Sequence, residues 1–358
     1  MESKIESEIT IKKNICIIYH HPCYDGLFGA INAFLYYKNF TNNKYQITFL
    51  PLRNIYPIFS QLTKKYDKII SLDLGMKEND IDFLTDKNNF DISVTLFDHH
   101  ESWFEQYKNV YEPLLKDRKK FHFIFDEKNE KSACGLSFNY YKNKALKKKD
   151  VDIKKVEEIF NQDLEKLNLY VEDSDTGKFS LKFIHEFKSG ISEENPLKYT
   201  NLTINQDKTI NRFLSINVSF MIKVGDKTLK KTKKKCKNIL LNNWIYIVEL
   251  KGGYKFLMCI TEDKYVRNYA CPFLGKISKK KGYLPIGAFV YKFEKGVYKF
   301  SMRAADDSVD ISKIANEYGG GGHKGAAAFI MDYNGIDNLI IGTIDIKNDL
   351  ISRGFIKH

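Results

Sequence analysis

Acidic and imidazole side chains follow three apolar runs in the first 100 residues of this chain. Each run is typical of a buried strand, and open α/β sheets bind their ligands at the carboxyl ends of their strands. One such group alone often caps a helix, but groups that recur at the same end of successive strands indicate a shared site. These residues are His20, His21, Asp25, Asp73, Asp98, His99 and His100.

Two further acids, Asp173 and Asp175, lie in the segment "YVEDSDTGKF". A mixed set of imidazoles and carboxylates suits Mn²⁺, Fe²⁺, Zn²⁺ or Mg²⁺, with phosphate oxygens completing the coordination. Two such ions about 3.5 to 4 Å apart generate hydroxide and hold the attacking and leaving oxygens of an in-line displacement. The set therefore predicts phosphoryl chemistry.

A second group of residues suited to phosphate lies in "MRA" and "YGGGGHKGAAAF". Glycines let the backbone turn sharply and present N–H groups to an anion, and a histidine can donate to a phosphate oxygen. An arginine is rare in this lysine-rich chain, and its planar guanidinium fits phosphate better than an ammonium does. The expected phosphate-binding residues are Arg303, Gly320, Gly321, Gly322 and His323.

The elements that must position these groups alternate along the first 180 residues. Short apolar runs alternate there with amphipathic stretches, as a parallel sheet with crossover helices requires. The expected strands are 14–21, 45–52, 68–75 and 92–100, the expected helices are 25–40 and 154–170, and "VEDSDTGKF" is expected to end the second helix.

The C-terminal part is predicted to hold a second sheet, because β-branched and aromatic runs return there. Strands are expected at 243–250, 254–260, 284–294, 297–304 and, as the last one, 325–332, with a helix at 311–318. The predicted fold class is α/β, with an N-terminal parallel-sheet domain, a smaller C-terminal α/β domain with a mixed sheet, and an active site in the cleft between them. The predicted division is a catalytic domain at 1–185, a connector with its own helix at 186–238, and a substrate-binding domain at 239–358.

Composition narrows the class of protein. The 358 residues carry a formal net charge of +12, which favours a polyanionic partner. The lysine runs at 147–149, 233–235 and 279–281 are better explained as solvated faces than as binding patches. Six cysteines without CxxC spacing argue against a zinc ribbon or a disulfide framework. With an acidic, polar start and no run long enough to span a membrane, a soluble, cytoplasmic protein in a reducing compartment is expected.

These motifs, in this order, resemble the DHH phosphoesterase superfamily, in the branch that carries the DHH-associated C-terminal domain. The resemblance covers nearly the whole chain, from "HHPCYDG" through "SLDLG", "FDHH" and "EDSDTGKF" to "GGGGHKGAAAF". "FDHH" and "GGGGH" are specific as a pair, and "DTGKF" is similar to the form found in bacterial oligoribonuclease members. Members of the family that act on 3'-phosphoadenosine 5'-phosphate and exopolyphosphatase-like members are also similar.

The resemblance implies a role for each matching residue. Asp73 would bridge two ions, and Asp25, His99 and Asp175 would complete the coordination of one of them. The expected cofactor is Mn²⁺, or Mg²⁺ or another divalent cation, with one or two ions bound. Arg303, the glycine loop and His323 would hold the remainder of the substrate.

The two other residues of the "FDHH" motif would act beside the ions. Asp98 would orient the neighbouring imidazole from behind, and His100 would face the substrate phosphate or the leaving oxygen.

The second ion position departs from the family pattern. Members commonly have an aspartate two residues before the Asp-Gly pair, where this chain has Cys23, and a thiolate is a softer ligand. Either His20 or His21 would be the imidazole ligand of that ion, beside Asp73. The sequence leaves one or two bound ions open.

The predicted function is metal-dependent hydrolysis of phosphodiester or phosphomonoester bonds in short oligonucleotides or small nucleotides. Hydrolysis of polyphosphate is the alternative, because the basic balance fits both substrates. A catalytically weakened protein that binds nucleic acid or nucleotide is the alternative from another class, and Cys23 is the feature that supports it. Editing of aminoacyl-tRNA is disfavoured because a synthetase-type zinc signature is absent. No membrane partner is expected, and the oligomeric state is left open.

Overall fold

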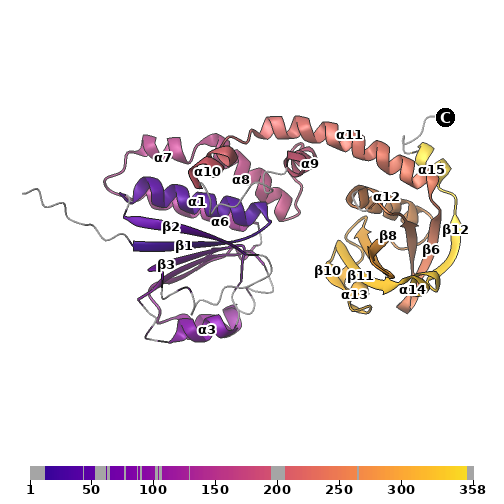
Figure 1. The fold of residues 1–358 in the computed structure, drawn as a ribbon, viewed down its shortest axis with the longest axis horizontal. Helices are drawn as coiled ribbons and strands as arrows, with labels where there is room; N and C mark the ends of the chain where they lie inside the picture. The colour runs from indigo at the N-terminus through magenta and orange to yellow at the C-terminus, as the bar shows by residue number, and fades with distance from the viewer. Residues whose placement is uncertain are drawn as a thin grey trace, which may run out of the picture. The chain divides into compact units, whose positions relative to one another are not determined.

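The computed structural model describes residues 13–42, 44–52, 62, 65–75, 78–86, 88, 91–100, 104, 107–128, 130–194, 206–263 and 266–352. The chain divides into two compact units, Met1–Asp226 and Lys227–His358, each built on a sheet of its own (Figure 1). The first sheet is parallel and the second is mixed. The predicted α/β class, with a parallel sheet followed by a mixed sheet, is confirmed.

The first unit is built on a five-stranded parallel sheet in the order β2-β1-β3-β4-β5. Its strands alternate their side chains between two cores, as a sheet covered on both faces requires. Ile15, Ile17 and Tyr19 of β1 belong to one core, and Cys16 and Ile18 belong to the other. The strands are β1 (Lys13–His20), β2 (Tyr45–Leu52), β3 (Lys68–Leu72), β4 (Ser93–Phe97) and β5 (Phe121–Ile124).

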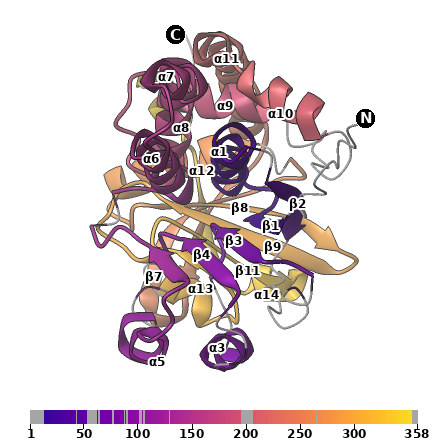
Figure 2. The same ribbon diagram turned by 90° about the vertical axis from the view of Figure 1, so that its left-hand side faces the viewer.

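Helices cover both faces of this sheet (Figure 2). On one face, α1 (Tyr24–Phe40), α6 (Ala133–Leu146), α7 (Ile153–Ile159) and α8 (Gln162–Asp175) contribute to the larger core. On the other face lie α3 (Glu78–Thr85) and α5 (Glu112–Leu115), which follows a π-helical turn at Tyr107–Tyr111. The site-bearing strands β1, β3 and β4 are therefore central and held from both sides.

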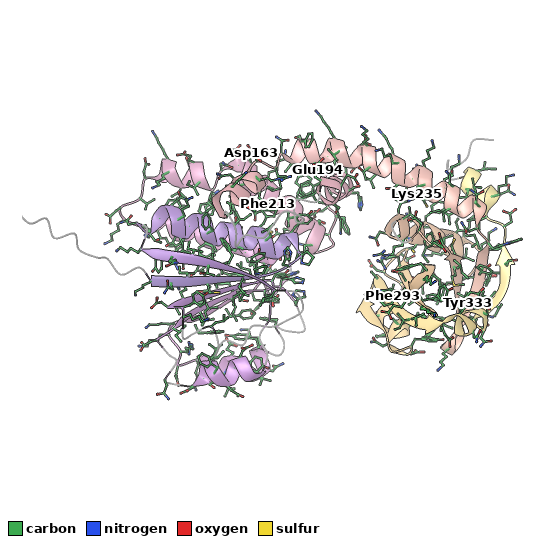
Figure 3. The ribbon with its side chains drawn as sticks, in the orientation of Figure 1. Asp163, Glu194, Phe213, Lys235, Phe293 and Tyr333 are labelled. Carbon is green, nitrogen blue, oxygen red and sulfur yellow. The ribbon has the colours of Figure 1, made fainter. Side chains whose placement is uncertain are left out.

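Three helices follow α8 in the chain: α9 (Ile184–Glu194), α10 (Gln206–Leu214) and α11 (Val218–Asn242). Phe213 of α10, labelled in Figure 3, packs edge-to-face on Phe28 of α1 with ring centroids 6.1 Å apart. The division between the units, at Asp226 and Lys227, falls inside α11. The predicted connector at 186–238 thus contains most of α9, all of α10 and most of α11, except for 195–205, which lie outside the described residues.

The second unit is built on a seven-stranded sheet in the order β10-β11-β9-β8-β7-β6-β12. Among these strands only β7 and β8 pair in parallel. The strands are β6 (Ile245–Leu250), β7 (Tyr254–Ile260), β8 (Ile286–Glu294), β9 (Val297–Ala304), β10 (Gly321–His323), β11 (Ala326–Asp332) and β12 (Ile340–Ile344), with a 3-10 turn at Lys251–Gly253 between β6 and β7.

Two cores lie on opposite faces of the second sheet. One holds side chains of α12 (Arg267–Lys280), α15 (Lys347–Ser352) and the last turns of α11. The other holds side chains of α13 (Ile311–Asn316) and α14 (Tyr333–Asp337), and Tyr333 contacts Tyr298 of β9 with ring centroids 5.6 Å apart. This unit too is a sheet covered on both faces.

Several elements differ from the sequence prediction. The strand at 326–332 is not the last, because β12 follows it and pairs with β6. Helix α12 was not predicted, since Pro272 and Gly275 interrupt its helical pattern. Helix α8 does not end at Tyr170 but continues to Asp175, because the acids of its last turns find partners elsewhere in the fold. None of the helices in the described ranges is long and apolar enough to span a bilayer.

Candidate metal centre

The predicted metal ligands converge at one edge of the first sheet. Strands β1, β3 and β4 are neighbours and parallel, so their carboxyl ends meet at the same edge. His20 ends β1, Asp73 follows β3 directly, and His99 lies two residues beyond β4. Asp73 has a left-handed backbone (φ 59°), which is uncommon for residues other than glycine and occurs where a chain turns sharply. Its N–H donates to Phe97 O at 2.9 Å, which fixes the turn against the end of β4.

Three carboxylates surround the ring of His99, which is nearly buried. The Nε2 atom of His99 lies 3.1 Å from Asp175 Oδ2, 3.6 Å from Asp73 Oδ1 and 3.9 Å from Asp25 Oδ2. Asp25 and Asp73 are buried, whereas Asp175, in the last turn of α8, is exposed. The structure thus brings together residues from α1, the ends of β3 and β4, and α8.

Asp25 is held by the first turn of α6. Its carboxylate accepts hydrogen bonds from the backbone N–H groups of Ala133 (2.9 Å) and Cys134 (2.8 Å) and from the hydroxyl of Ser132. A carboxylate at a helix N-terminus satisfies N–H groups that the helix leaves unpaired. The next residue, Gly26, lets α1 approach β1, because a Cβ there would lie 2.6 Å from His20 O. The Asp-Gly pair therefore has a structural role besides its chemical one.

The protonation of these groups follows from their crowding. Burial, and then the charges of Asp175 and Asp73, raise the pKa of Asp25 to about 7. Burial alone would lower the pKa of His99, but the carboxylates of Asp175 and Asp73 outweigh it and raise the pKa to about 11. Burial acts to raise the pKa of Asp73, yet His20 and His99 lower it well below its ordinary value. Without a cation, positive charge at this edge comes from the imidazoles.

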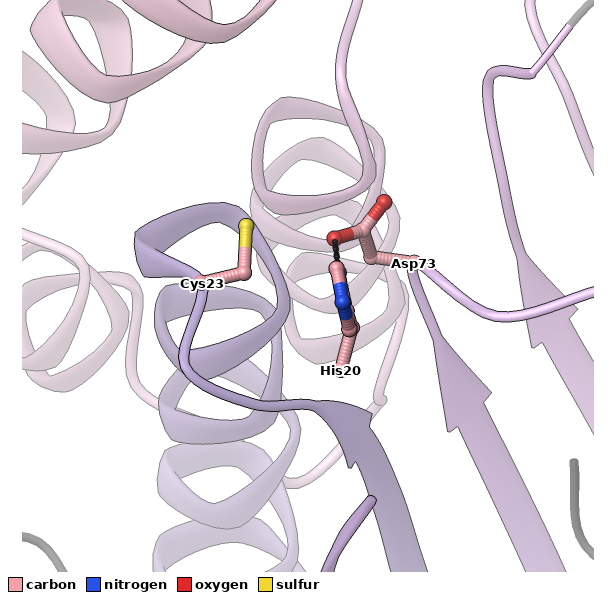
Figure 4. A group of neighbouring side chains, drawn as sticks. All are labelled: His20, Cys23 and Asp73. Carbon is pink, nitrogen blue, oxygen red and sulfur yellow. Dashed lines mark hydrogen bonds and ion pairs between the residues drawn. The ribbon is translucent and has the colours of Figure 1, made fainter. Parts of the chain in front are cut away.

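A second group of side chains consists of His20, Cys23 and Asp73 (Figure 4). It shares Asp73 with the carboxylates around His99. His20 Nδ1 lies 3.0 Å from Asp73 Oδ2, and the Cys23 thiol is 4.0 Å from Asp175 Oδ1. The hydrogen bond to Asp73 raises the pKa of His20, and burial raises that of Cys23, which keeps the thiol neutral. Of the two adjacent histidines, His20 is the one that faces Asp73, while His21 packs edge-to-face against Tyr19.

Asp98 holds the ring of His100. Its buried Oδ1 accepts the N–H groups of His99 (2.7 Å) and His100 (3.2 Å) and contacts His100 Nδ1 at 2.7 Å. That hydrogen bond raises the pKa of His100. The ring of His100 is 50% exposed, and because Nδ1 is engaged, Nε2 is the nitrogen available to a bound molecule. The orienting contact of Asp98 thus goes to His100 and not to the ring of His99.

The donor set fits a divalent cation. Three groups of side chains offer ligand atoms within 4.8 Å of one another: His20, Cys23 and Asp73; Asp73, His99 and His100; and Asp25, His99 and Asp175. Within the described part of the chain, the buried Nε2 of His99 makes no well-directed hydrogen bond although three carboxylates lie within 4 Å of it. Buried polar atoms normally have hydrogen-bond partners, so the lack of one at His99 Nε2 indicates that a binding partner of this atom is missing. Imidazole and carboxylate ligands suit Mn²⁺, Mg²⁺, Fe²⁺ or Zn²⁺.

Several residues support the site in roles that the sequence did not reveal. Asp173, a candidate ligand by sequence, instead accepts Ser180 N and Oγ and Leu181 N, and so stabilises the turn after α8. Glu172 accepts Ser132 N at 3.2 Å, and a Cβ at Gly135 would lie 1.6 Å from its Oε2. The sequence signal for the start of α6 is weak, because the small-residue run "SACG" precedes a stretch without a clear amphipathic pattern.

In the second unit, the structure places Arg303 in a row of paired residues that crosses three strands. Arg303 pairs with Ala326, and Ala326 pairs with His323 on the other side, so the three lie side by side across β9, β11 and β10. The guanidinium of Arg303 donates to Met302 O (2.7 Å), Ser301 Oγ (3.3 Å) and Asn268 Oδ1 (2.9 Å). Burial lowers the pKa of Arg303.

Two of the glycines before His323, Gly320 and Gly322, leave no room for a side chain. Gly319 has φ 69°, and a Cβ at Gly320 would lie 2.3 Å from Ala328 O. The N–H groups of Gly319 and Gly320 donate to Asn316 O and Ala315 O at the end of α13, while Gly321 and Gly322 pair with β11. The predicted phosphate contacts of Gly320, Gly321, Gly322 and His323 stay a prediction.

Comparison with known proteins finds a family match within the second unit. Residues 254–341 match the family model described as the DHHA1 domain. No curated protein matches the sequence. One similar solved structure is a pGpG-specific phosphodiesterase, PggH, from Vibrio cholerae, with 12% identity, coverage of 96% of this chain and 98% of the other, and a TM-score of 0.46. An exopolyphosphatase-related protein from Bacteroides fragilis shows 14% identity, coverage of 99% and 97%, and a TM-score of 0.44.

The DHHA1 match runs from the start of β7 to the first residues of β12 in the second unit and includes Arg303 and the glycine loop. That domain is the one that the sequence resemblance implies for the C-terminal part. The family match therefore supports the resemblance to the DHH superfamily in the C-terminal part of the chain.

Proposed function

We propose that this protein is a metal-dependent phosphoesterase that hydrolyses short oligonucleotides or small nucleotides. One observation carries the proposal: Asp25, Asp73 and Asp175 surround His99 Nε2 at the carboxyl edge of a parallel sheet. In such sheets ligands bind at that edge. Three carboxylates around one imidazole repel one another unless a cation or protons neutralise them, and a divalent ion bound there also attracts phosphate oxygens.

Each residue has a distinct part in this proposal. Asp25, His99 and Asp175 would hold one ion, and Asp73 would be shared with a second position formed with His20 and Cys23. A bound divalent ion supplies a water of lowered pKa and a positive charge for the phosphate. His100, oriented by Asp98 through Nδ1, presents Nε2 to the phosphate or the leaving oxygen. The hydrogen bond to Asp98 raises the pKa of His100, which favours the protonated ring that a donor to that oxygen requires.

The second unit would bind the part of the substrate that the metal centre does not hold. Arg303 is the group best suited to phosphate, because its fork of donors matches two phosphate oxygens. His323 and Gly320 to Gly322 are proposed as its neighbours in that role. The active site predicted between the two domains stays a prediction.

Polyphosphate hydrolysis is the alternative activity, since the same metal centre would act on a phosphoanhydride and the net charge of +12 suits either substrate. The alternative from another class is a weakened protein that only binds nucleotide. Cys23 is the observation that favours it, because a neutral thiol stands where an acidic ligand is expected. The five other proposed ligands lie close to one another at the sheet edge, which favours the enzyme: His20, Asp25, Asp73, His99 and Asp175.

The test is hydrolysis by the purified full-length protein with Mn²⁺. Substrates are a 5'-labelled dinucleotide, a longer labelled oligonucleotide and long-chain polyphosphate. Asp73→Asn keeps the shape of the side chain and removes its charge from both ion positions, so hydrolysis is expected to fall by about 10³-fold or more. Asp91→Asn is the matched control, because Asp91 is fully exposed and its carboxylate pairs with Lys120 at the surface. Turnover that survives Asp73→Asn, or nucleotide binding without any turnover by the unmodified protein, would overturn the proposal.

A further inference from the structure

Two aromatic rings lie on the surface shortly after the metal ligand Asp175. Phe179 is 39% exposed and stacks on His185, with ring centroids 5.1 Å apart and an angle of 26° between the planes. His185 is exposed as well, so ring surface of this pair remains open to solvent. We call Phe179 and His185 the aromatic platform.

The platform is tied to the same end of α8 that carries Asp175. The carboxylate of Asp173 accepts the N–H groups of Ser180 (2.9 Å) and Leu181 (3.1 Å), and Phe179 N donates to Asp173 O at 3.3 Å. The buried carboxylate of Asp173 therefore holds the turn that begins four residues after Asp175.

Lys188 of α9 packs on the aromatic platform. Its ammonium lies over the Phe179 ring, 4.9 Å from the centroid. Surrounding protein lowers the pKa of Lys188, although its side chain is exposed, and the nearby charge of Asp175 opposes that lowering.

The backbone of Phe179 gives a second reason to look for a function. Its φ is 48°, in the left-handed region that bulky residues avoid. Such strain persists where the surrounding structure imposes it, and it concentrates at sites that bind ligands. Here the strained conformation directs no side chain into the core, because the ring of Phe179 is exposed. Folding alone therefore does not explain a phenylalanine at this position.

An exposed, stacked pair of rings, one of them on the turn that follows the proposed metal ligand Asp175, suits a nucleobase. Proteins that bind single-stranded nucleic acids stack bases on aromatic and imidazole rings, because every base has a π face. Inorganic polyphosphate has no planar group and would gain nothing from the rings. We propose that the aromatic platform stacks a base of a substrate whose phosphate lies at the metal centre, and that the substrate is therefore a nucleotide and not polyphosphate.

The inference rests on the proposed function, and the experiment separates the two. Phe179→Leu keeps an apolar side chain and removes the ring. Phe220→Leu is the matched control, because Phe220 is an exposed phenylalanine of α11 in the same unit. The substrates are the 5'-phosphorylated diadenosine dinucleotide pApA, the same molecule with both bases removed, and tripolyphosphate.

The expected result is a change in KM for one substrate only. Phe179→Leu should raise the KM for pApA about tenfold, the loss of one stacking contact, with kcat within about twofold. Hydrolysis of the base-free molecule should stay the same, since it has nothing to stack. Equal losses on pApA and the base-free molecule would show that the substitution only disturbs Asp175, and an unchanged KM for pApA, or tripolyphosphate as the preferred substrate, would also overturn the inference.

A binding measurement keeps the inference testable if no substrate is hydrolysed. Calorimetric titration of pApA into the Asp73→Asn variant, with and without Phe179→Leu, measures stacking in the absence of turnover. About tenfold weaker binding in the double variant supports the platform even if the proposed activity fails. Equal binding by both variants overturns the platform even if the activity is found.

Discussion

The two units offer groups for phosphate chemistry in different ways. In the first unit the groups follow the ends of parallel strands, where the backbone is released from the sheet and can turn. Asp73 does so with a left-handed φ of 59°. In the second unit Arg303 and His323 lie within paired strands, in one row with Ala326 between them. Strand ends let side chains converge on a point, as an ion requires, whereas a row across strands presents an extended surface, which suits a longer anion.

The two regions also differ in whether their polar side-chain atoms have hydrogen-bond partners within the protein. In the first unit, His99 Nε2 and Asp98 Oδ2 are buried without a hydrogen-bond partner among the residues that the structure describes. In the second unit, Arg303 donates to three protein acceptors. We therefore expect the first region to depend on a bound ion for its stability and the second to depend much less on any ligand.

The largest effect expected from this contrast concerns Asp25. Its pKa is about 7 in the folded chain, against an ordinary value of 3.8, so the metal-free folded chain binds more protons than the unfolded chain between about pH 4 and pH 7. The free energy of unfolding contributed by Asp25 therefore falls as the pH rises through that range. The pKa of His99 is raised from its ordinary 6.5 to about 11, so the free energy of unfolding that His99 contributes also falls as the pH rises between these two values.

In Asp25→Asn, the fall in the free energy of unfolding between about pH 4 and pH 7 should disappear. The fall at higher pH, which comes from His99, should remain. Thermal unfolding with a chelator, at a series of pH values, measures both, and Asp91→Asn serves as control. The same variant should hydrolyse substrate about 10³-fold more slowly when metal is added. Parallel stability curves for the variant and the unmodified protein would contradict the comparison.

A smaller effect is expected from Arg303 in the second unit. Arg303→Lys keeps the charge but loses the planar fork and the contact with Asn268, so the KM for a dinucleotide should rise about tenfold while kcat changes little. Arg303→Met, which also removes the charge, should raise KM further. Steady-state kinetics over a range of substrate concentrations separates the two constants. A fall in kcat with an unchanged KM would place Arg303 at the reacting phosphate instead.

The smallest effect is expected from the lysine runs. Lys279 is exposed, and its Nζ lies 2.8 Å from Asp306 Oδ2. Surface pairs of this kind contribute little to stability, so Lys279→Gln should change neither the melting temperature nor kcat/KM by more than a small amount. Both are measured beside the Arg303 variants. A tenfold loss of kcat/KM would show that the basic runs bind substrate and that the second unit has a larger binding surface than Arg303 and the glycine loop.

The sequence was sufficient where local pattern and topology coincide. Strands β2, β7 and β9 match their predicted ranges, and the meeting of Asp73 and His99 follows from the rule that parallel strands end at one edge. The sequence was insufficient where contacts between distant segments of the chain determine the structure. The carboxylate of Asp25 is bound by Ala133 and Cys134, more than a hundred positions along the chain, and no local spacing indicates that contact.

The end of α8 shows the same limit. The polar run "VEDSD" contains no apolar pattern that would extend a helix, yet α8 continues through it to Asp175. Glu172 and Asp173 find partners in Ser132, Ser180 and Leu181, so tertiary hydrogen bonds replace the missing pattern. The choice between His20 and His21 likewise required coordinates, because adjacent residues of one type differ only in direction.

The bond between Asp25 and α6 makes two backbone amides into reporters. Asp25 accepts the N–H groups of Ala133 and Cys134 with the same carboxylate that lies beside His99. A cation drawing on that carboxylate would weaken both bonds and shift the amide resonances of Ala133 and Cys134. Nuclear magnetic resonance of the isotope-labelled protein could thus follow occupancy of the centre during a metal titration, with no probe attached to the protein.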